Sequence, residues 1–532
     1  MAKTGKPTHI LALDFGTESV RGALTDIHGK ILHSASKSYK TYYSHPGWAE
    51  QKPDEWWESF TSVTRELLNR SDIDPESIVS MAVDTTACTV LALDEHFKPL
   101  RDAILWMDVR AFDQADRIAA SGLEPLKYNG YGSVSAEWMA PKALWLKECE
   151  PATYEKSRHI CGFQDWINYM LTGEFVGSMT NVAVRWYYDS RNGGWPVEFY
   201  SAIGLGDLIE KFPPEIYGVG KPIGTITPDV SRQTGLSTKT LLVQGGADAL
   251  VAVLGLGAVK TGRVAFITGS SHLLLGHTDR EIHHPGVFGA YPDGAMPGLY
   301  LVEGAQISTG SILRWFKEGF ISRRYEDEAE DRGVSLYGYM NELAEKIPPG
   351  SEGLVLLNYW QGNRNPITDA QARGALWGLS LNHTPAHVYR AIMEGISYGT
   401  EHIMRHFRAA GFMPGELYSC GGATGSDLWM QMQSDVLGLP ILTTEEPNAP
   451  ILGDAILASY GCGIYGSIEE AADKMVRISR RYEPDPGKTK RYAYYVDRYI
   501  ETYERLKDMM HDMVKHEREE KAAKPQRSRS RS

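Results

Sequence analysis

Five turns in the sequence combine aspartate, glycine and hydroxyl side chains directly after short apolar runs. They are Asp14–Thr17, Asp84–Thr86, Gly245–Asp248, Thr268–Ser271 and Gly421–Gly425. Glycine lets a backbone approach an anion closely, and successive N–H groups at such a turn form a concave, positively polarised site. Two such turns that face each other would grip a polyphosphate. A single turn of this kind more often only ends a strand.

Two aspartates in these turns suit metal binding and proton transfer. Asp14 can hold a hydrated Mg²⁺, an ion that prefers hard oxygen ligands and keeps several of its waters. Asp248 follows Gly245 and Gly246 at a strand end, where its carboxylate can point into a cleft and accept a proton. The residues alone explain Asp248 equally well as the N-cap of the next helix. They therefore leave both a general base and a helix cap open.

Strands must position these turns, and the apolar runs predict them. The runs His9–Leu13, Val20–Asp26 and Lys30–Ser36 predict a β-meander, and apolar residues at helical spacing predict a helix over 53–69. A similar strand-turn pattern returns at about residues 262–303. We therefore expect two similarly built halves of mixed strands and helices, which is the α/β class.

Composition and charge limit the possible classes of protein. The 532 residues are 42% hydrophobic and 23% charged, as in ordinary globular proteins, and the formal charge of −12 disfavours nucleic acid as a partner. No apolar run is long enough to predict a membrane span, and the N-terminus lacks the apolar core of a secretory signal. Five scattered cysteines without a CxxC pair fit a reducing compartment. We expect a cytoplasmic protein with no nucleic-acid or membrane partner.

Two common nucleotide-binding motifs are missing from the sequence: neither GxxxxGK[ST] nor a GxGxxG that opens a helix is present. Seven other segments, in order over roughly residues 9–480, resemble the FGGY family of carbohydrate kinases. In the first half, LALDFGTESVRGALTD is similar to the family's first phosphate motif, HPGWAEQKPDEWWES to the segment before its first long helix, and APKALWLKECEP to its first-domain signature. QGGADA is similar to the turn with the family's catalytic aspartate, and FITGSSH is similar to its second phosphate motif. SCGGATGSDLWMQMQSDVLGLPI is similar to the family's adenosine motif, and GDAILASYGCG is similar to its closing motif. Each match is weak alone, but seven in the right order are specific.

The resemblance implies an actin-like ATPase fold, with two ribonuclease-H-like domains and an active site in the cleft between them. It implies an N-terminal sugar-binding domain over 1–243 and a C-terminal ATP-binding domain over 244–485. A C-terminal helix over 486–520 and a disordered basic tail over 521–532 are expected to follow. We also expect a homodimer.

The resemblance also implies ATP and Mg²⁺ as cofactors. Asp248 takes the role of catalytic base, and Asp14 holds Mg²⁺ through water with Asp248 near the ion. The residues that the resemblance places around ATP are Thr17, Ser19, Arg21, Gly269, Ser270, Gln306, Gly310, Gly422, Ala423 and Ser426. Ser426 stands near a position where the family usually has asparagine.

Three further segments resemble the ribulokinase-like branch of the family: VDTTACTVLALD, SAEWMAPK and VEGAQISTGSI. They imply sugar contacts from Ala87, Glu137, Arg185 and Glu303, together with Asp248. Arg185 departs from the lysine expected there. A guanidinium is a planar group with donors in a fixed fork, whereas an ammonium is a compact point charge, so the two hydrogen-bond differently. The segment LWMDVRA lacks an insertion associated with L-ribulokinases, which favours a D-ribulose-type substrate.

The expected activity is ATP-dependent phosphorylation of a terminal hydroxyl of a pentulose, D-ribulose to D-ribulose 5-phosphate in particular. Three alternatives stay open from the sequence. The first is a kinase for another small sugar or polyol: L-ribulose, D-xylulose, erythritol or glycerol. The second is an actin-like ATPase that polymerises and has no sugar substrate. The third is a catalytically inactive sugar sensor.

Overall fold

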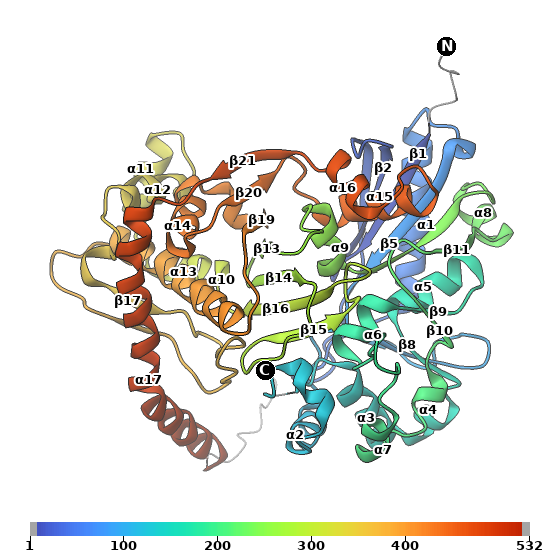
Figure 1. Ribbon diagram of the computed structural model, residues 1–532, viewed down its shortest axis with the longest axis horizontal. Coiled ribbons are helices and arrows are strands. Elements are labelled where there is room, and N and C mark those ends of the chain that lie inside the picture. The colour runs from blue at the N-terminus through green and yellow to red at the C-terminus, as the bar shows by residue number, and fades with distance from the viewer. Residues whose placement is uncertain (1–7, 133, 524–532) are drawn as a thin grey trace, which may run out of the picture.

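The computed structural model describes residues 8–132 and 134–523, which form two lobes, each built on one large sheet (Figure 1). The strands of the first sheet are β1 (His9–Phe15), β2 (Ser19–Asp26), β3 (Ile31–Ser38), β5 (Ile78–Thr85), β11 (Pro222–Thr225) and β12 (Leu241–Ala247). Those of the second are β13 (Arg263–Thr268), β14 (His272–Thr278), β15 (Phe288–Pro292), β16 (Tyr300–Gln306), β19 (Glu416–Gly421), β20 (Ile441–Thr444) and β21 (Ile478–Tyr482). Their orders are β11-β12-β5-β1-β2-β3 and β15-β16-β14-β13-β19-β20-β21.

Helices and shorter strands complete the lobes. Before the end of β12 the helices are α1 (Pro53–Arg70), α2 (Phe112–Ala120), α3 (Met139–Cys149), α4 (Pro151–Lys156), α5 (Phe163–Thr172), α6 (Met179–Arg185), α7 (Val197–Ala202) and α8 (Pro228–Thr234). After it they are α9 (Asp248–Gly255), α10 (Gly310–Phe320), α11 (Arg323–Asp331), α12 (Leu336–Glu345), α13 (Pro385–Ala409), α14 (Asp427–Leu437), α15 (Ala449–Gly461), α16 (Ile468–Met475) and α17 (Pro486–Ala523). The shorter strands are β4 (Glu50–Gln51), β6 (Val90–Leu93), β7 (Ala103–Ile104), β8 (His159–Gly162), β9 (Val176–Ser178), β10 (Glu215–Tyr217), β17 (Val355–Leu357) and β18 (Ala375–Trp377).

The two large sheets repeat one strand pattern. In the first, β1 is antiparallel to β2, β2 is antiparallel to β3, and β5 runs parallel to both β1 and β12. In the second, β13 is antiparallel to β14, β14 is antiparallel to β16, and β19 runs parallel to both β13 and β20. Each pattern ends in one antiparallel strand, β11 or β21. This is the repeat that the strand-turn patterns near residues 10–36 and 262–303 predict.

Strand β1 is buried on both faces, and its alternate residues contact different layers. Leu11 and Leu13 pack in one cluster with residues of α1 and α5, whereas Ile10 and Ala12 pack in another with residues of α15. Successive side chains of a strand point to opposite faces, so an uninterrupted apolar run is what a sheet covered on both sides requires. The turn after β1 therefore lies at a sheet edge between two layers of helices.

Helix α15 comes from the last part of the chain but packs on the first sheet and against α9 (Figure 1). Glycines allow this close helix crossing. A Cβ atom at Gly255 of α9 would lie 1.9 Å from the carbonyl oxygen of Ala449, and one at Gly453 of α15 would lie 2.2 Å from that of Val251. The expected domain boundary between residues 243 and 244 falls inside β12, a strand of the first sheet.

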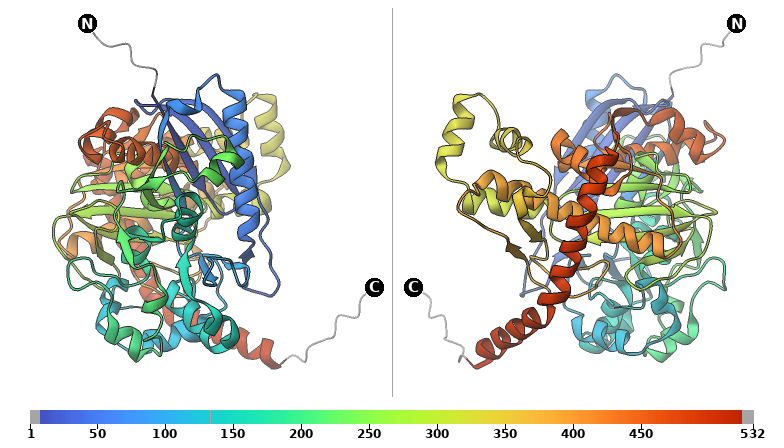
Figure 2. Two further views of the ribbon diagram at one scale, coloured as in Figure 1. Left: turned by 90° about the vertical axis from the view of Figure 1, so that its right-hand side faces the viewer. Right: turned by 60° about the vertical axis from the view of Figure 1, so that its left-hand side comes forward.

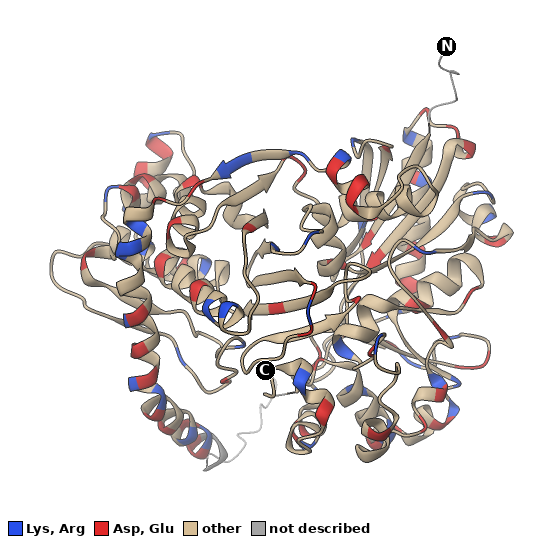
Figure 3. Ribbon diagram, viewed as in Figure 1, with Lys and Arg blue, Asp and Glu red and all other residues tan. Residues whose placement is uncertain are grey.

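The C-terminal helix α17 starts at Pro486, packs against α13 and α14, and then extends away from the lobe (Figure 2). It ends at Ala523, so the first three residues of the expected disordered tail are helical, and residues 524–532 with the Arg-Ser run lie outside the described residues. Side chains of both charges alternate along its last turns (Figure 3). Among the described residues, no helix combines the length and hydropathy that crossing a membrane requires.

We predict that Gly255→Ala lowers the free energy of unfolding by about 1–3 kcal/mol, because the added methyl group must push α9 away from α15. Gly319→Ala is the matched control. Gly319 lies in α10 with open space where its Cβ atom would stand, so alanine should leave stability unchanged or raise it by about 0.5–1 kcal/mol. Urea denaturation followed by circular dichroism measures both. A Gly255→Ala protein as stable as the parent would show that the crossing is looser than described.

Candidate active site

A pocket of about 580 Å³ lies between the lobes, at the ends of β1, β5, β12 and β13. Eight of the residues predicted from the sequence line it: Thr17, Ala87, Glu137, Arg185, Asp248, Ser270, Glu303 and Gln306. They come from turns far apart in the chain, and the structure brings them to one cleft. The other predicted site residues are not part of this lining; they are Asp14, Ser19, Arg21, Gly269, Gly310, Gly422, Ala423 and Ser426.

Asp248 is the first residue of α9, directly after β12. Ala247 occupies the cap position, so the carboxylate of Asp248 is not the helix cap that the sequence left open. The side chain is half-buried, lines the pocket, and accepts a hydrogen bond at Oδ1 from the backbone N–H of Ala249 at 2.7 Å. Burial, followed by the charge of Asp14, raises the pKa of Asp248 to about 7. A carboxylate with this pKa can take up and release a proton near neutral pH.

Two further aspartates, Asp84 and Asp454, lie next to Asp14. Asp84 is opposite Asp14 in the parallel register of β1 and β5, and Asp454 reaches Asp84 from α15. Both carboxyl groups are fully buried, and burial raises the pKa of each well above its usual range. The neighbouring charge of Asp14 acts in the same direction on both. Burial and the neighbouring charges therefore favour the protonated form of both carboxyl groups.

Asp14 has the features of a Mg²⁺ ligand. Its Oδ2 atom is paired with the guanidinium of Arg21, and its Oδ1 atom is buried with no hydrogen-bond partner among the described residues. Within the described part of the chain, no group of three or more His, Cys, Asp or Glu side chains could enclose a metal. Mg²⁺ does not need such a cage, because one or two carboxylates, water and phosphate oxygens suffice. Asp14, with Asp248 nearby, fits that requirement.

The two predicted phosphate turns have free donors on their surfaces. In the second, Gly269–Ser271, the side chains of Ser270 and Ser271 are exposed and line the pocket, while the first turn of α10 supports the loop from behind. The backbone N–H of Gly310 donates to the carbonyl oxygen of Gly269 at 3.1 Å. In the first turn, the hydroxyl of Thr17 accepts a hydrogen bond from the indole of Trp106 at 2.9 Å.

The predicted adenosine residues follow the second phosphate turn. Gly421 lies opposite Thr268 in the register of β13 and β19, with a φ of +97°, and a Cβ atom there would lie 1.7 Å from the carbonyl oxygen of Thr268. Gly422 has open space around it, and the N–H of Ala423 donates to the hydroxyl of Thr268 at 3.3 Å. Ser426 caps α14. The motif therefore forms a backbone surface next to the phosphate turn.

Gln306 lines the pocket wall, but its side-chain amide is engaged inside the second lobe. Its Nε2 atom donates to the hydroxyl of Thr400 at 2.8 Å, and its Oε1 atom accepts from Asn358 at 2.7 Å. The sequence resemblance predicts this residue as an ATP contact, and that role stays a prediction. The structure shows an amide that fixes the end of β16 to α13.

The predicted sugar contacts are joined across the cleft by ion pairs. Arg185 of the first lobe forms two hydrogen bonds of 2.7 Å to the carboxylate of Glu303 of the second, and it donates to the hydroxyl of Tyr291 at 2.8 Å. Glu137 of the first lobe accepts from Arg364 of the second at 3.1 Å. Ala87 lies on the pocket wall after β5. The part of the pocket around these predicted sugar contacts is therefore lined by charged side chains that are already paired with one another.

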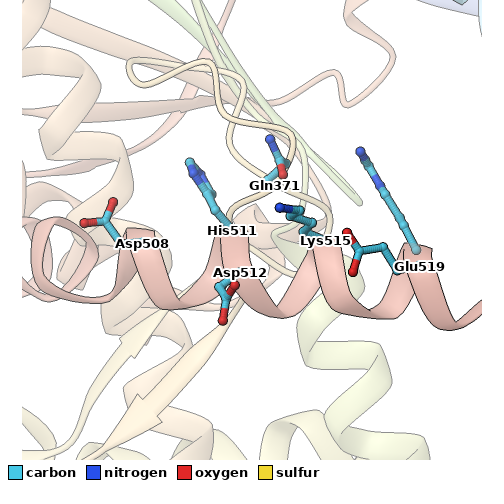
Figure 4. A pocket seen from close by; sticks show the side chains of 7 residues that line it. Gln371, Asp508, His511, Asp512, Lys515 and Glu519 are labelled. Atoms are coloured by element: carbon cyan, nitrogen blue, oxygen red, sulfur yellow. The ribbon is translucent and has the colours of Figure 1, made fainter.

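The sequence analysis missed several residues at this site. Arg364, Trp106 and His272 line the pocket, and Asp454 reaches the carboxyl cluster. Asp84 had a sequence signal because it ends an apolar run like that before Asp14, and Asp454 and His272 lie inside the quoted segments GDAILASYGCG and FITGSSH. A second hollow lies on α17 around His511, whose Nε2 atom is 2.7 Å from the carboxylate of Asp369 (Figure 4). It contains none of the predicted site residues.

Comparisons with known proteins cover most of the chain. The model of the N-terminal domain of the FGGY family of carbohydrate kinases matches residues 9–255, and that of the C-terminal domain matches residues 264–462. A ribulokinase of Bacillus licheniformis is 33% identical over 481 residues, which are 86% of this chain and 87% of the relative. An FGGY carbohydrate kinase domain-containing protein of Xenopus laevis is 32% identical, over 90% of this chain and 94% of its own.

The solved structures confirm the fold. A ligand-bound xylulose kinase from Lactobacillus acidophilus superposes with a TM-score of 0.84 at 23% identity, over 94% of this chain and 98% of its own. The two lobes with duplicated sheets and an intervening cleft are thus the actin-like α/β arrangement that the sequence resemblance implies.

We predict that Asp454→Asn raises the melting temperature more at pH 8 than at pH 5. The folded pair binds a proton that the unfolded chain releases above about pH 4, so the stability that it contributes falls as pH rises toward its raised pKa, by about 1.4 kcal/mol per pKa unit. Asparagine has the same shape and does not titrate. Differential scanning fluorimetry measures the shift, with Asp473→Asn at a half-exposed ion pair as control. Equal shifts at the two pH values would contradict a protonated pair.

Proposed function

Because this chain belongs to the FGGY family of carbohydrate kinases, we propose that it transfers the γ-phosphoryl group of ATP to a terminal hydroxyl of a pentulose, and that D-ribulose is converted to D-ribulose 5-phosphate. One observation carries the proposal. The carboxylate of Asp248, with its pKa raised to about 7, lines the same pocket as hydroxyl residues of the two glycine turns and as the residues of the interlobe ion pairs.

Asp248 acts as the general base in this scheme. Its carboxylate accepts the proton of the acceptor hydroxyl as the oxygen of that hydroxyl attacks the γ-phosphorus, while the bond from the γ-phosphorus to the β,γ-bridging oxygen breaks and ADP leaves. Ser270, Ser271 and Thr17 supply hydroxyl donors from both turns, and the exposed backbone at Gly269 lets phosphate oxygens approach. The backbone surface at Gly422 and Ala423 receives the adenine. Arg21, whose guanidinium is half-exposed, is placed to turn from Asp14 to a phosphate oxygen.

Mg²⁺ would be held by Asp14, with Asp248 beside it. Once bound, the ion neutralises charge on the phosphate oxygens. The unpartnered Oδ1 atom of Asp14 supports this assignment.

Polar side chains on the acceptor side support a polyhydroxylated substrate. A sugar must find hydrogen-bond partners for each hydroxyl that it buries. Glu137, Arg185, Glu303 and Arg364 provide carboxylate acceptors and guanidinium donors there. The ribulokinase relative favours a pentulose, and the five free cysteines among the described residues support a reducing compartment such as the cytoplasm.

We predict that Asp248→Asn lowers kcat by about 10²–10⁴-fold and leaves ATP affinity within about threefold of the parent, because only the proton acceptor is lost. In the parent enzyme, kcat/KM should rise about tenfold per pH unit below pH 7 and level off above it, since the base must be ionised. Steady-state kinetics and ATP titration calorimetry measure these effects. Asp279→Asn, at an exposed aspartate, is the control. Unchanged turnover in Asp248→Asn would remove this residue from the mechanism.

We predict that D-ribulose gives the highest kcat/KM in an ADP-release assay with D-ribulose, L-ribulose, D-xylulose, erythritol or glycerol as acceptor. A faster acceptor would replace D-ribulose in the proposal but keep the kinase. ATP hydrolysis that no acceptor stimulates, together with light scattering on addition of ATP and Mg²⁺, would indicate a polymerising ATPase instead. A sugar that raises the melting temperature without ATP consumption would indicate a sensor.

A further inference from the structure

We propose that Lys142 is a positioning residue for the acceptor pocket, and that its ammonium group holds in place the two first-lobe loops that line this pocket. The inference rests on the proposed function for the identity of the ligand. It assigns a role to a buried side chain that does not touch the substrate.

Lys142 lies near the start of α3, and its side chain is fully buried. Its Nζ atom donates to three backbone carbonyl oxygens: those of Cys88 at 2.8 Å, Leu105 at 2.6 Å and Trp106 at 3.4 Å. An ammonium group has three donors, so all three are used. None of the three acceptors is a carboxylate, and burying a cation in this way costs free energy that packing alone does not require. The three bonds thus point to a task that needs the charge.

Two of the three acceptors belong to residues that line the pocket, Cys88 and Trp106, and the third, Leu105, directly precedes Trp106. Cys88 follows β5, and Trp106 follows β7; both line the pocket, as do their neighbours Ala87 and Met107. Cys88 has a φ of +58°, a left-handed conformation that is unfavourable for a residue other than glycine. The bond from Lys142 is made to the carbonyl of this same residue. Lys142 therefore stabilises a loop that would otherwise relax away from its present shape.

The loop at Trp106 also reaches the phosphate side. Its indole donates to the hydroxyl of Thr17 in the first phosphate turn, while its carbonyl accepts from Lys142. A single ammonium group thus connects the acceptor wall with the loop proposed to bind phosphate. Displacing the two loops should weaken acceptor binding more than ATP binding, because ATP has further contacts in the second lobe.

The charge of Lys142 also gives the proposal a pH readout. Burial lowers the pKa of Lys142 to about 8; the neighbouring Cys88, Asp108 and Glu137 raise it, and Arg110 lowers it. Above this pH the neutral amine has only two N–H donors for three carbonyls. Because the pKa is lower in the folded than in the unfolded chain, this group makes the fold more stable, not less, as pH rises from about 8 to 10. Weaker acceptor binding between about pH 8 and 10 would therefore result from displacement of the two loops and not from unfolding of the protein.

The test compares Lys142→Met, which keeps the length but has no donors, with Lys142→Gln, which keeps two. Lys147→Met is the matched control, because Lys147 lies on the same helix, is partly exposed, and binds Asp207 and the carbonyl of Gly204 away from the pocket. We expect Lys142→Met to raise the acceptor KM by about tenfold or more, Lys142→Gln to raise it less, and both to change the ATP KM by less than about threefold. Lys147→Met should change neither.

Hydrogen exchange measured by mass spectrometry tests the loops without any substrate. Peptides that cover residues 86–89 and 105–108 should exchange faster in Lys142→Met and at the parent rate in Lys147→Met. If Lys142→Met does not fold, two other measurements take its place. One is hydrogen exchange in Lys142→Gln. The other is the acceptor KM of the parent enzyme between pH 7 and 9, which should rise while the ATP KM stays constant. Unchanged exchange in these loops, or equal increases in both KM values, would overturn the proposal. If the two loops exchange faster in Lys142→Met but the parent enzyme phosphorylates no acceptor, only the proposed function would be overturned.

Discussion

Four aspartates crowd together where β1, β5 and β12 end beside α15, and the chemistry of the cleft depends on how their charges are distributed. In a site that excludes water, neighbouring carboxylates cannot all be ionised. Asp14 is paired with Arg21, and burial raises the pKa of Asp84 and of Asp454 well above the usual range. Asp248, which is nearest the pocket, keeps a pKa near neutrality. The basicity of this carboxylate, which we propose as the base, is thus set by its own burial and by the charge of Asp14.

Charged side chains are also paired with one another in the part of the pocket where we propose that the sugar binds. Arg185 with Glu303 and Glu137 with Arg364 join one lobe to the other, so each charged side chain has a partner before a ligand arrives. Satisfied buried networks hold their members in fixed orientations. Under the proposed function, a sugar hydroxyl would meet donors and acceptors whose positions are already determined. Fixed polar groups of this kind are what discrimination between stereoisomers requires.

Much of the framework could be predicted from local patterns. Apolar runs that end in Asp, Gly and hydroxyl residues located the strand ends, and neighbouring parallel strands end at the same sheet edge, which is why Asp14 and Asp248 come together. The pairing of Arg185 with Glu303 joins residues 118 positions apart and has no local signal. Gln306 ends its strand and lines the pocket, and nothing local indicates that its amide also bonds to Thr400 inside the second lobe. Asp454 lies in an alanine-rich helix, and only the packing of α15 on the first sheet brings it to Asp84.

That packing of α15 also affects how the chain can fold during synthesis. The face of the first sheet that carries Ile10, Ala12 and Ala82 is covered by a helix that ends only at Gly461. A ribosome therefore releases nearly all of the second lobe before the first can bury this apolar face. Until then the nascent first lobe presents it to solvent, where a chaperone can bind it.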